Sequence, residues 1–101
     1  MKTTVAIPHH DLPSDHRDLA QERVQQLERI GDEVHGLHVV LELDHLNHRV
    51  EIVANIDHGQ TLVSEGREES FHAALDAACA RMETQLRRHH ERLVDRRHGK
   101  G

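Results

Sequence analysis

The sequence predicts an α+β protein: a two-layer sandwich in which a four-stranded mixed sheet carries both helices on one face. Four segments have the composition or alternation of strands, and two others repeat apolar residues at helical spacing, in the order β-α-β-β-β-α. Each strand has a single apolar face, so both helices have to cover the same side of the sheet. A helix separates the first two strands, which makes them parallel with a right-handed crossover.

The first strand and the first helix occupy the N-terminal third of the chain. Residues 2–7 are rich in β-branched side chains and end at Pro8, which predicts a short strand. The pair Pro13–Ser14 then begins a helix over residues 14–30, and Gly31 ends it. One stripe of this helix is apolar, formed by Leu19 or Ala20, Val24, Leu27 and Ile30.

Three strands follow, joined by two tight turns. We expect them at residues 34–45, 49–56 and 60–65, and the first two alternate apolar with polar side chains as half-buried strands do. Residues 45–48 and 57–59 contain the turn-forming residues of two antiparallel hairpins. Gly66 is expected to mark the end of the fourth strand.

The last helix is predicted from residues 68–70 to Val94, with one buried stripe and one basic ridge. The stripe contains Phe71, Leu75, Ala78, Met82, Leu86 and Leu93. At 100° per residue, Arg88 and Arg92 fall within about 20° of Arg81. We call these three residues the arginine ridge.

Length and composition limit the classes of protein that fit. A chain of 101 residues is one domain, expected over residues 1–94, with a basic, disordered tail over residues 95–101. No apolar run approaches the roughly 18 residues of a membrane span, and no signal-peptide pattern is present. The single cysteine, Cys79, fits a reducing, cytoplasmic setting.

Charge is divided unevenly along the chain. Residues 81–101 contain seven basic and three acidic residues, a net of +4, whereas residues 1–80 contain six basic and fifteen acidic residues, a net of −9. This division predicts a basic segment on an acidic body. The alternative is a solvated helix end whose cations complement the helix dipole.

Twelve histidines make the net charge sensitive to pH. Complete protonation would move the formal charge from −5 toward +7. Histidine titrates near pH 6.5, so affinity for an anionic partner is expected to rise as pH falls from about 7.5 to 6.

Catalytic and metal chemistry find little support. The histidine pairs at residues 9–10, 35 and 38, 45 and 48, and 89–90 each supply only two ligands, so we interpret them as surface histidines without a metal. Cys79 is interpreted as structural. No glycine-rich phosphate loop or Gly-x-Ser-x-Gly motif occurs, so we expect no enzyme, no cofactor and no small-molecule substrate.

The arginine ridge indicates binding to phosphate. Arginine forms forked, charge-assisted hydrogen bonds with phosphate oxygens. The only aromatic residue is Phe71, which excludes stacking platforms that read bases. The sequence therefore predicts recognition of a folded RNA by its shape and backbone.

Several motifs resemble a known family. The segments 71–76 and 85–93 are similar to the second helix of the ribosome hibernation promoting factors, also called ribosome-associated inhibitor or sigma-54 modulation proteins. Leu27-Glu28 with Asp32, and then Val39-Val40-Leu41, resemble the end of that family's first helix and its second strand. The resemblance covers about residues 2–94 and corresponds to a short form of the family.

The resemblance implies a cytoplasmic bacterial protein that binds the small ribosomal subunit, contacts its rRNA and prevents translation during stress. Carried over position by position, the basic residues that match the family are Arg81, Arg88, His90 and Arg92 on the second helix and Arg17 and Arg23 on the first. Together with Arg87, they form the predicted RNA-binding set. The alternative is a protein-interaction module of the same fold that does not bind the ribosome, which the acidic body favours.

Overall fold

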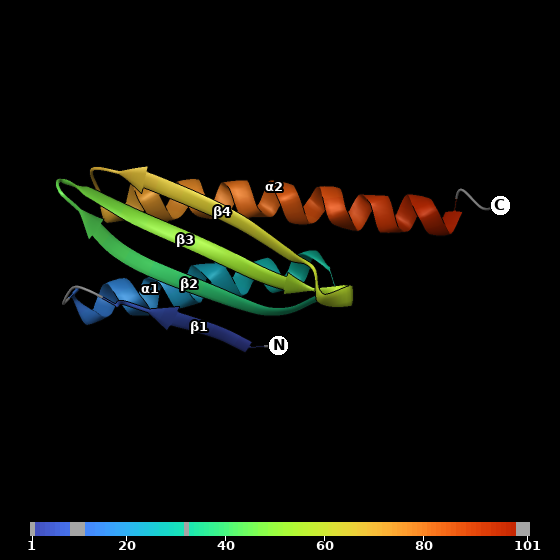
Figure 1. Cartoon of the computed structure of the whole chain (residues 1–101), viewed down its shortest axis with the longest axis horizontal. Coiled ribbons are helices and arrows are strands. Elements are labelled where there is room, and N and C mark those ends of the chain that lie inside the picture. The colour runs from blue at the N-terminus through green and yellow to red at the C-terminus, as the bar shows by residue number, and fades with distance from the viewer. Residues whose placement is uncertain (1, 9–11, 32, 99–101) are drawn as a thin grey trace.

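The fold is the predicted two-layer sandwich. The computed structural model describes residues 2–8, 12–31 and 33–98. Its sheet has the order β1-β2-β3-β4, and the helices α1 and α2 both lie on one side of it (Figure 1). The strands are β1 (Lys2–Ala6), β2 (Val34–Asp44), β3 (Asn47–Ile56) and β4 (Thr61–Glu68), and the helices are α1 (Ser14–Gln25) and α2 (Phe71–His98).

The strand register places alternate side chains on opposite faces of the sheet. β1 is parallel to β2, with Val5 opposite Val39, and both hairpins are antiparallel. The inward residues pack with the apolar stripes of both helices into one core, as the alternation predicts, except that Leu93 of the predicted stripe lies outside the core and is partly exposed. The fully buried side chains with the largest volumes are Leu37, Leu41, Ile52, Leu75, Met82, Leu86, Val24, Val39 and Val50.

The first helix departs from the prediction in its last turn. α1 ends at Gln25, and a 3₁₀ segment, η1 (Gln26–Ile30), replaces the remaining residues of the predicted helix. Helices often tighten in this way at their C-terminal end, where the last carbonyl groups have no partner further along an α-helix. In a 3₁₀ helix, side chains three residues apart eclipse one another. Residues 26 and 29 are thereby aligned.

The prediction that Gly66 ends the fourth strand is wrong. β4 continues to Glu68, and Gly66 is buried inside it. A Cβ atom at this position would lie 2.1 Å from the carbonyl oxygen of Ala74 on α2. Glycine is therefore required here because the backbone of α2 approaches the strand closely. Such a close approach is a common reason for glycine within a strand.

The turn between β2 and β3 is shorter than predicted. β3 begins at Asn47, two residues before the predicted start, which leaves His45 and Leu46 as the loop. His45 has a φ of 58°, a left-handed conformation that two-residue hairpin turns require.

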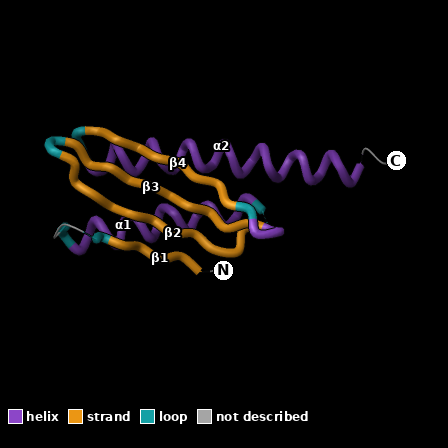
Figure 2. Tube along the Cα trace, viewed as in Figure 1, coloured by secondary structure: helices purple, strands orange, loops and turns teal. Residues whose placement is uncertain are grey.

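The second helix is longer than predicted. α2 runs to His98, so residues 95–98 of the predicted disordered tail are helical, while residues 99–101 lie outside the described chain. Its C-terminal end extends beyond the sheet (Figure 2). Arginine and aspartate are compatible with a helix, and no glycine interrupts the segment before Gly99, so the helix continues without the sheet.

Candidate nucleic-acid interface

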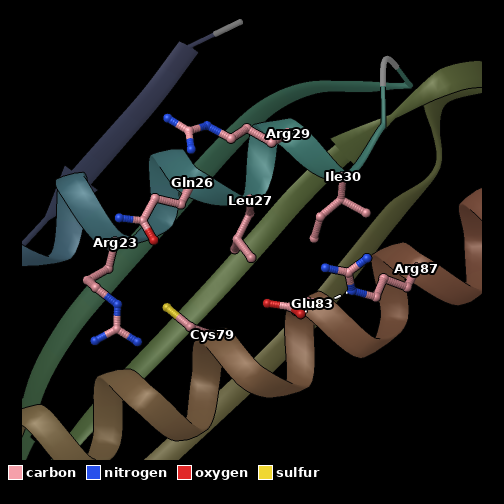
Figure 3. Close-up of a pocket in the computed structure, with 8 residues that line it drawn as sticks. All are labelled: Arg23, Gln26, Leu27, Arg29, Ile30, Cys79, Glu83 and Arg87. Carbon is pink, nitrogen blue, oxygen red and sulfur yellow. Dashed lines mark hydrogen bonds and ion pairs between the residues drawn. The ribbon is translucent and has the colours of Figure 1, made fainter.

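A groove between the two helices brings cations from separate parts of the chain together. It encloses about 360 Å³. Figure 3 shows α1 and η1 on one side and α2 on the other, with Leu27 and Cys79 between them. We call this surface the inter-helix groove; its lining residues are Arg23, Gln26, Leu27, Arg29, Ile30, Cys79, Glu83 and Arg87.

Two arginines of the inter-helix groove are paired with carboxylates of the protein. Arg23 Nη1 lies 2.6 Å from Asp76 Oδ1 and thus connects α1 to α2. Arg87 Nε lies 3.0 Å from Glu83 Oε2, one helical turn away. Such solvent-exposed pairs contribute only about 0–1 kcal/mol, so a phosphate can replace the carboxylate at small cost.

The arginine ridge is exposed, but its members differ in their partners. Arg81 donates from Nη1 to the backbone carbonyl of Glu65 on β4. Arg88 and Arg92 are exposed and make no ion pair or hydrogen bond to any side chain that the structure describes, in contrast to Arg87. Among the described side chains, Arg88 and Arg92 are therefore the two ridge residues without an internal partner.

The other predicted contact residues are held by neighbouring groups. Arg17 donates from Nη1 to the Val5 carbonyl at 3.0 Å. His90 Nδ1 lies 3.1 Å from Glu33 Oε1, and the Glu33 side chain is only 7% exposed. The role of His90 and Arg17 in binding RNA stays a prediction.

The structure adds one cation that the prediction omitted. Arg29, on η1, lines the inter-helix groove with Arg23 and Arg87. The three-residue spacing of Arg23, Gln26 and Arg29 was visible in the sequence. Its significance depends on the 3₁₀ turn, which the sequence did not predict.

The cysteine lies at the base of the inter-helix groove and is buried, 7% exposed. Its burial raises the pKa of the Cys79 thiol above its usual value, and the nearby Asp76 and Glu83 carboxylates raise it further against the lowering effect of Arg23. Cys79 is therefore a protonated thiol at neutral pH, in keeping with a structural role.

The predicted histidine pairs do not form a metal centre within the described part of the chain. Those residues contain no group of three or more histidine, cysteine or acidic side chains placed to hold an ion. His35 contacts Asp57, and His38 Nδ1 lies 2.6 Å from Thr4 Oγ1, so these two histidines have separate partners. Residues 9 and 10 lie outside the described residues.

Membrane insertion through a helix has no support in the described residues. None of their helices combines the length and the apolar character that a bilayer span needs.

Fold and site together define a class: a two-layer α+β domain whose helical side presents arginines at a groove and along α2. Residues 4–94 match the family described as "Sigma 54 modulation protein / S30EA ribosomal protein". The chain belongs to this family, which confirms the resemblance found in the sequence.

Two curated relatives share one name, ribosome hibernation promoting factor. The chain is 26% identical over 83 residues to a "Ribosome hibernation promoting factor" of Azotobacter vinelandii, a match that covers 82% of this chain and 77% of the relative. It is 25% identical over 92 residues to a protein of that name from Pseudomonas putida, covering 91% and 89% of the two chains.

Solved structures share the fold. A ribosomal subunit interface protein from Coxiella burnetii superposes with a TM-score of 0.76 at 20% identity, covering 90% of this chain and 99% of that one. The N-terminal domain of Thermus thermophilus Protein Y gives a TM-score of 0.72 at 27% identity, covering 85% and 93%. These likenesses confirm the predicted β-α-β-β-β-α order with its mixed sheet.

Proposed function

We propose that the chain is a ribosome-binding hibernation factor that inhibits translation by docking on small-subunit rRNA in the cytoplasm. The names of its relatives support ribosome association. The helical side supplies the docking surface, because phosphate contacts need exposed cations rather than aromatic platforms. The observation that carries the proposal is the pair of exposed guanidinium groups, Arg88 and Arg92.

The inter-helix groove supplies the second part of the surface. Arg23 and Arg87 hold carboxylates that a phosphate can displace, and Arg29 adds an exposed cation. The positions of these groups are fixed by the packing of α1 against α2. We therefore expect the helical side to hold the rRNA backbone through several contacts without reading its sequence.

Cosedimentation of the protein with purified small ribosomal subunits tests the proposal. We expect the native chain to pellet with the subunits, and Arg88→Gln and Arg92→Gln each to weaken binding several-fold, because each removes one phosphate contact. Arg67→Gln is the matched control, since Arg67 lies on β4 and pairs with Asp44 at 3.3 Å. Absence of the native chain from the pellet would contradict the proposal.

The alternative function is a protein-interaction module of the same fold. Its support is the exposed sheet face, where Arg49 is surrounded by the carboxylates of Glu42, Glu51 and Glu65 at 2.6–3.1 Å. Recovery of a discrete protein partner in a pull-down without ribosomal material would favour this alternative.

A further inference from the structure

A second pocket lies at the opposite end of the sheet from the β2–β3 turn (Figure 1). It encloses about 370 Å³ between η2 (Asp57–Gly59), the 3₁₀ segment that joins β3 to β4, and the second half of α2. We call it the turn pocket. Its lining residues are Asp57, His58, Gln60, His89, Arg92 and Leu93.

The acidic group of the turn pocket is engaged by a histidine from the sheet. The register of β2 against β3 shifts between Val34 and Gly36, which makes His35 the extra residue of a bulge. Its Nε2 contacts Asp57 Oδ1. Asp57 therefore has a partner on β2, and attraction of an incoming anion falls to the other side chains that line the turn pocket.

One cation of the turn pocket sits at an unusual backbone position. His58 has a φ of 65°, a left-handed conformation that favours glycine or asparagine. Its side chain is exposed and lines the pocket opposite α2. A histidine here places an imidazole at the tip of a tight turn, where it faces His89 and Arg92.

The charge of the turn pocket depends on pH. Among the described residues, the titratable or charged groups around it are His35 from β2, Asp57 and His58 from η2, and His89 and Arg92 from α2. The next α2 residue after His89 is His90, which is paired with Glu33. When the two lining histidines are protonated, three cations surround a cavity of a size that accommodates a tetrahedral oxyanion.

We infer that the turn pocket binds a phosphate group through His58, His89 and Arg92, and that binding strengthens as these histidines become protonated. The site is separate from the inter-helix groove. The phosphate could belong to an RNA backbone or to a free phosphorylated metabolite, since both present the same oxyanion to the three cations.

Sulfate is the probe for the site because it remains a dianion between pH 6 and 7.5. Histidine imidazole resonances are followed by NMR as sulfate replaces chloride at constant ionic strength. Because histidine side chains gain positive charge as pH falls through this range, we expect sulfate affinity to rise several-fold from pH 7.5 to pH 6.

His58→Gly is the informative variant. Glycine adopts the same left-handed conformation without strain, so the turn is retained while the imidazole is lost. We expect sulfate affinity at pH 6 to fall about fivefold or more. His45→Gly is the matched control, because His45 has a φ of 58° in the hairpin turn at the opposite end of the sheet.

Three results would overturn the inference: no saturable shift of any imidazole at pH 6, equal losses in the two glycine variants, or an affinity independent of pH. Competition by a short RNA duplex would assign the bound phosphate to a nucleic-acid backbone, and its failure to compete would assign the pocket to a free oxyanion. Neither the sulfate titration nor the RNA competition uses ribosomes, so the result of these experiments is independent of the proposed function.

Discussion

At the residue scale, the seven predicted contact residues differ in what holds them. Arg88 and Arg92 have no partner among the described side chains, whereas Arg23 and Arg87 have exposed carboxylates and His90 has the buried Glu33. A helical projection places a side chain on a face but does not reveal a partner distant in sequence. Arg23 and Asp76 are 53 positions apart, and only tertiary structure brings them together.

Glycine at position 66 illustrates a second limit of sequence reasoning. A glycine after a short strand is typical of a turn, yet here it allows β4 and α2 to approach closely. Nothing local in the sequence distinguishes the two cases, since the reason lies in the backbone of Ala74 and Ala78.

Gly66→Ala should therefore destabilise the fold strongly. The added Cβ would meet the Ala74 carbonyl at 2.1 Å and the Ala78 nitrogen at 2.8 Å, so strand and helix have to separate. We expect a loss of at least about 2 kcal/mol in the free energy of unfolding, measured by urea denaturation. Gly59→Ala is the comparison: its Cβ would meet open space at a φ of 73°, which costs about 1 kcal/mol. A loss at Gly66 no larger than at Gly59 would refute this reason for the glycine.

At the element scale, an aromatic cluster joins α1, β3 and the first residue of α2. The ring of His16 stacks on Phe71 at 4.1 Å and 6°, and His48 meets Phe71 edge-on at 6.0 Å. Both histidine Nδ1 atoms are buried without a hydrogen-bond partner in the described structure. Burial lowers the pKa of His48, and repulsion from His16 lowers it further. The contact between the elements is therefore best preserved when His48 is neutral.

Stability should fall as pH drops through the range in which an unfolded histidine becomes protonated. The unfolded chain binds a proton at His48 near pH 6.5, whereas the folded chain does so only at lower pH. Protonation thus favours unfolding below about pH 6.5. Above that pH, the contribution of neutral His48 to the stability of the fold is fully present. Urea denaturation at pH 7.5, 6.5 and 5.5 gives the free energy of unfolding at each pH. Between pH 7.5 and 5.5, this free energy should fall less for His48→Leu than for the native chain.

His45→Gln is the control for this pH dependence, since the His45 side chain is 95% exposed. Between pH 7.5 and 5.5, His45→Gln should lose as much stability as the native chain does. Identical pH profiles for His48→Leu and the native chain would show that His48 does not couple folding to protonation.

The order of elements and the buried face of each were predictable because they follow from short-range periodicity. Val50, Ile52, Ala54 and Ile56 alternate along β3 and are all buried, as predicted. The 3₁₀ turn of η1 and the bulge at His35 were not predictable, because each depends on packing between segments. Both irregularities position residues of the surfaces described above, Arg29 in the inter-helix groove and His35 beside the turn pocket.

At the scale of the whole molecule, the two sides of the sandwich differ in chemistry. On the sheet side, Arg49 is surrounded by three carboxylates, whereas the helical side presents Arg88 and Arg92 without such partners in the described structure. A net charge of −5 therefore coexists with a local surface suited to phosphate. The proposed orientation on rRNA places the helices toward the nucleic acid and the sheet away from it.

Affinity for small ribosomal subunits should increase at lower pH. Protonation of exposed histidines adds positive charge to a chain whose formal net charge is −5, which favours an anionic partner. We expect several-fold tighter binding at pH 6 than at pH 7.5, measured at fixed salt concentration. A flat profile would exclude a histidine contribution while leaving the arginine contacts intact.

The salt dependence of binding to isolated small subunits tests the central claim most directly, namely that Arg88 and Arg92 contact rRNA phosphates. Each phosphate contact contributes about 0.7–0.9 to the slope of log affinity against log salt concentration. The Arg88→Gln/Arg92→Gln double variant should therefore bind more weakly and give a slope shallower than that of the native chain by about 1.5. Equal affinities and equal slopes for the two proteins would contradict the account.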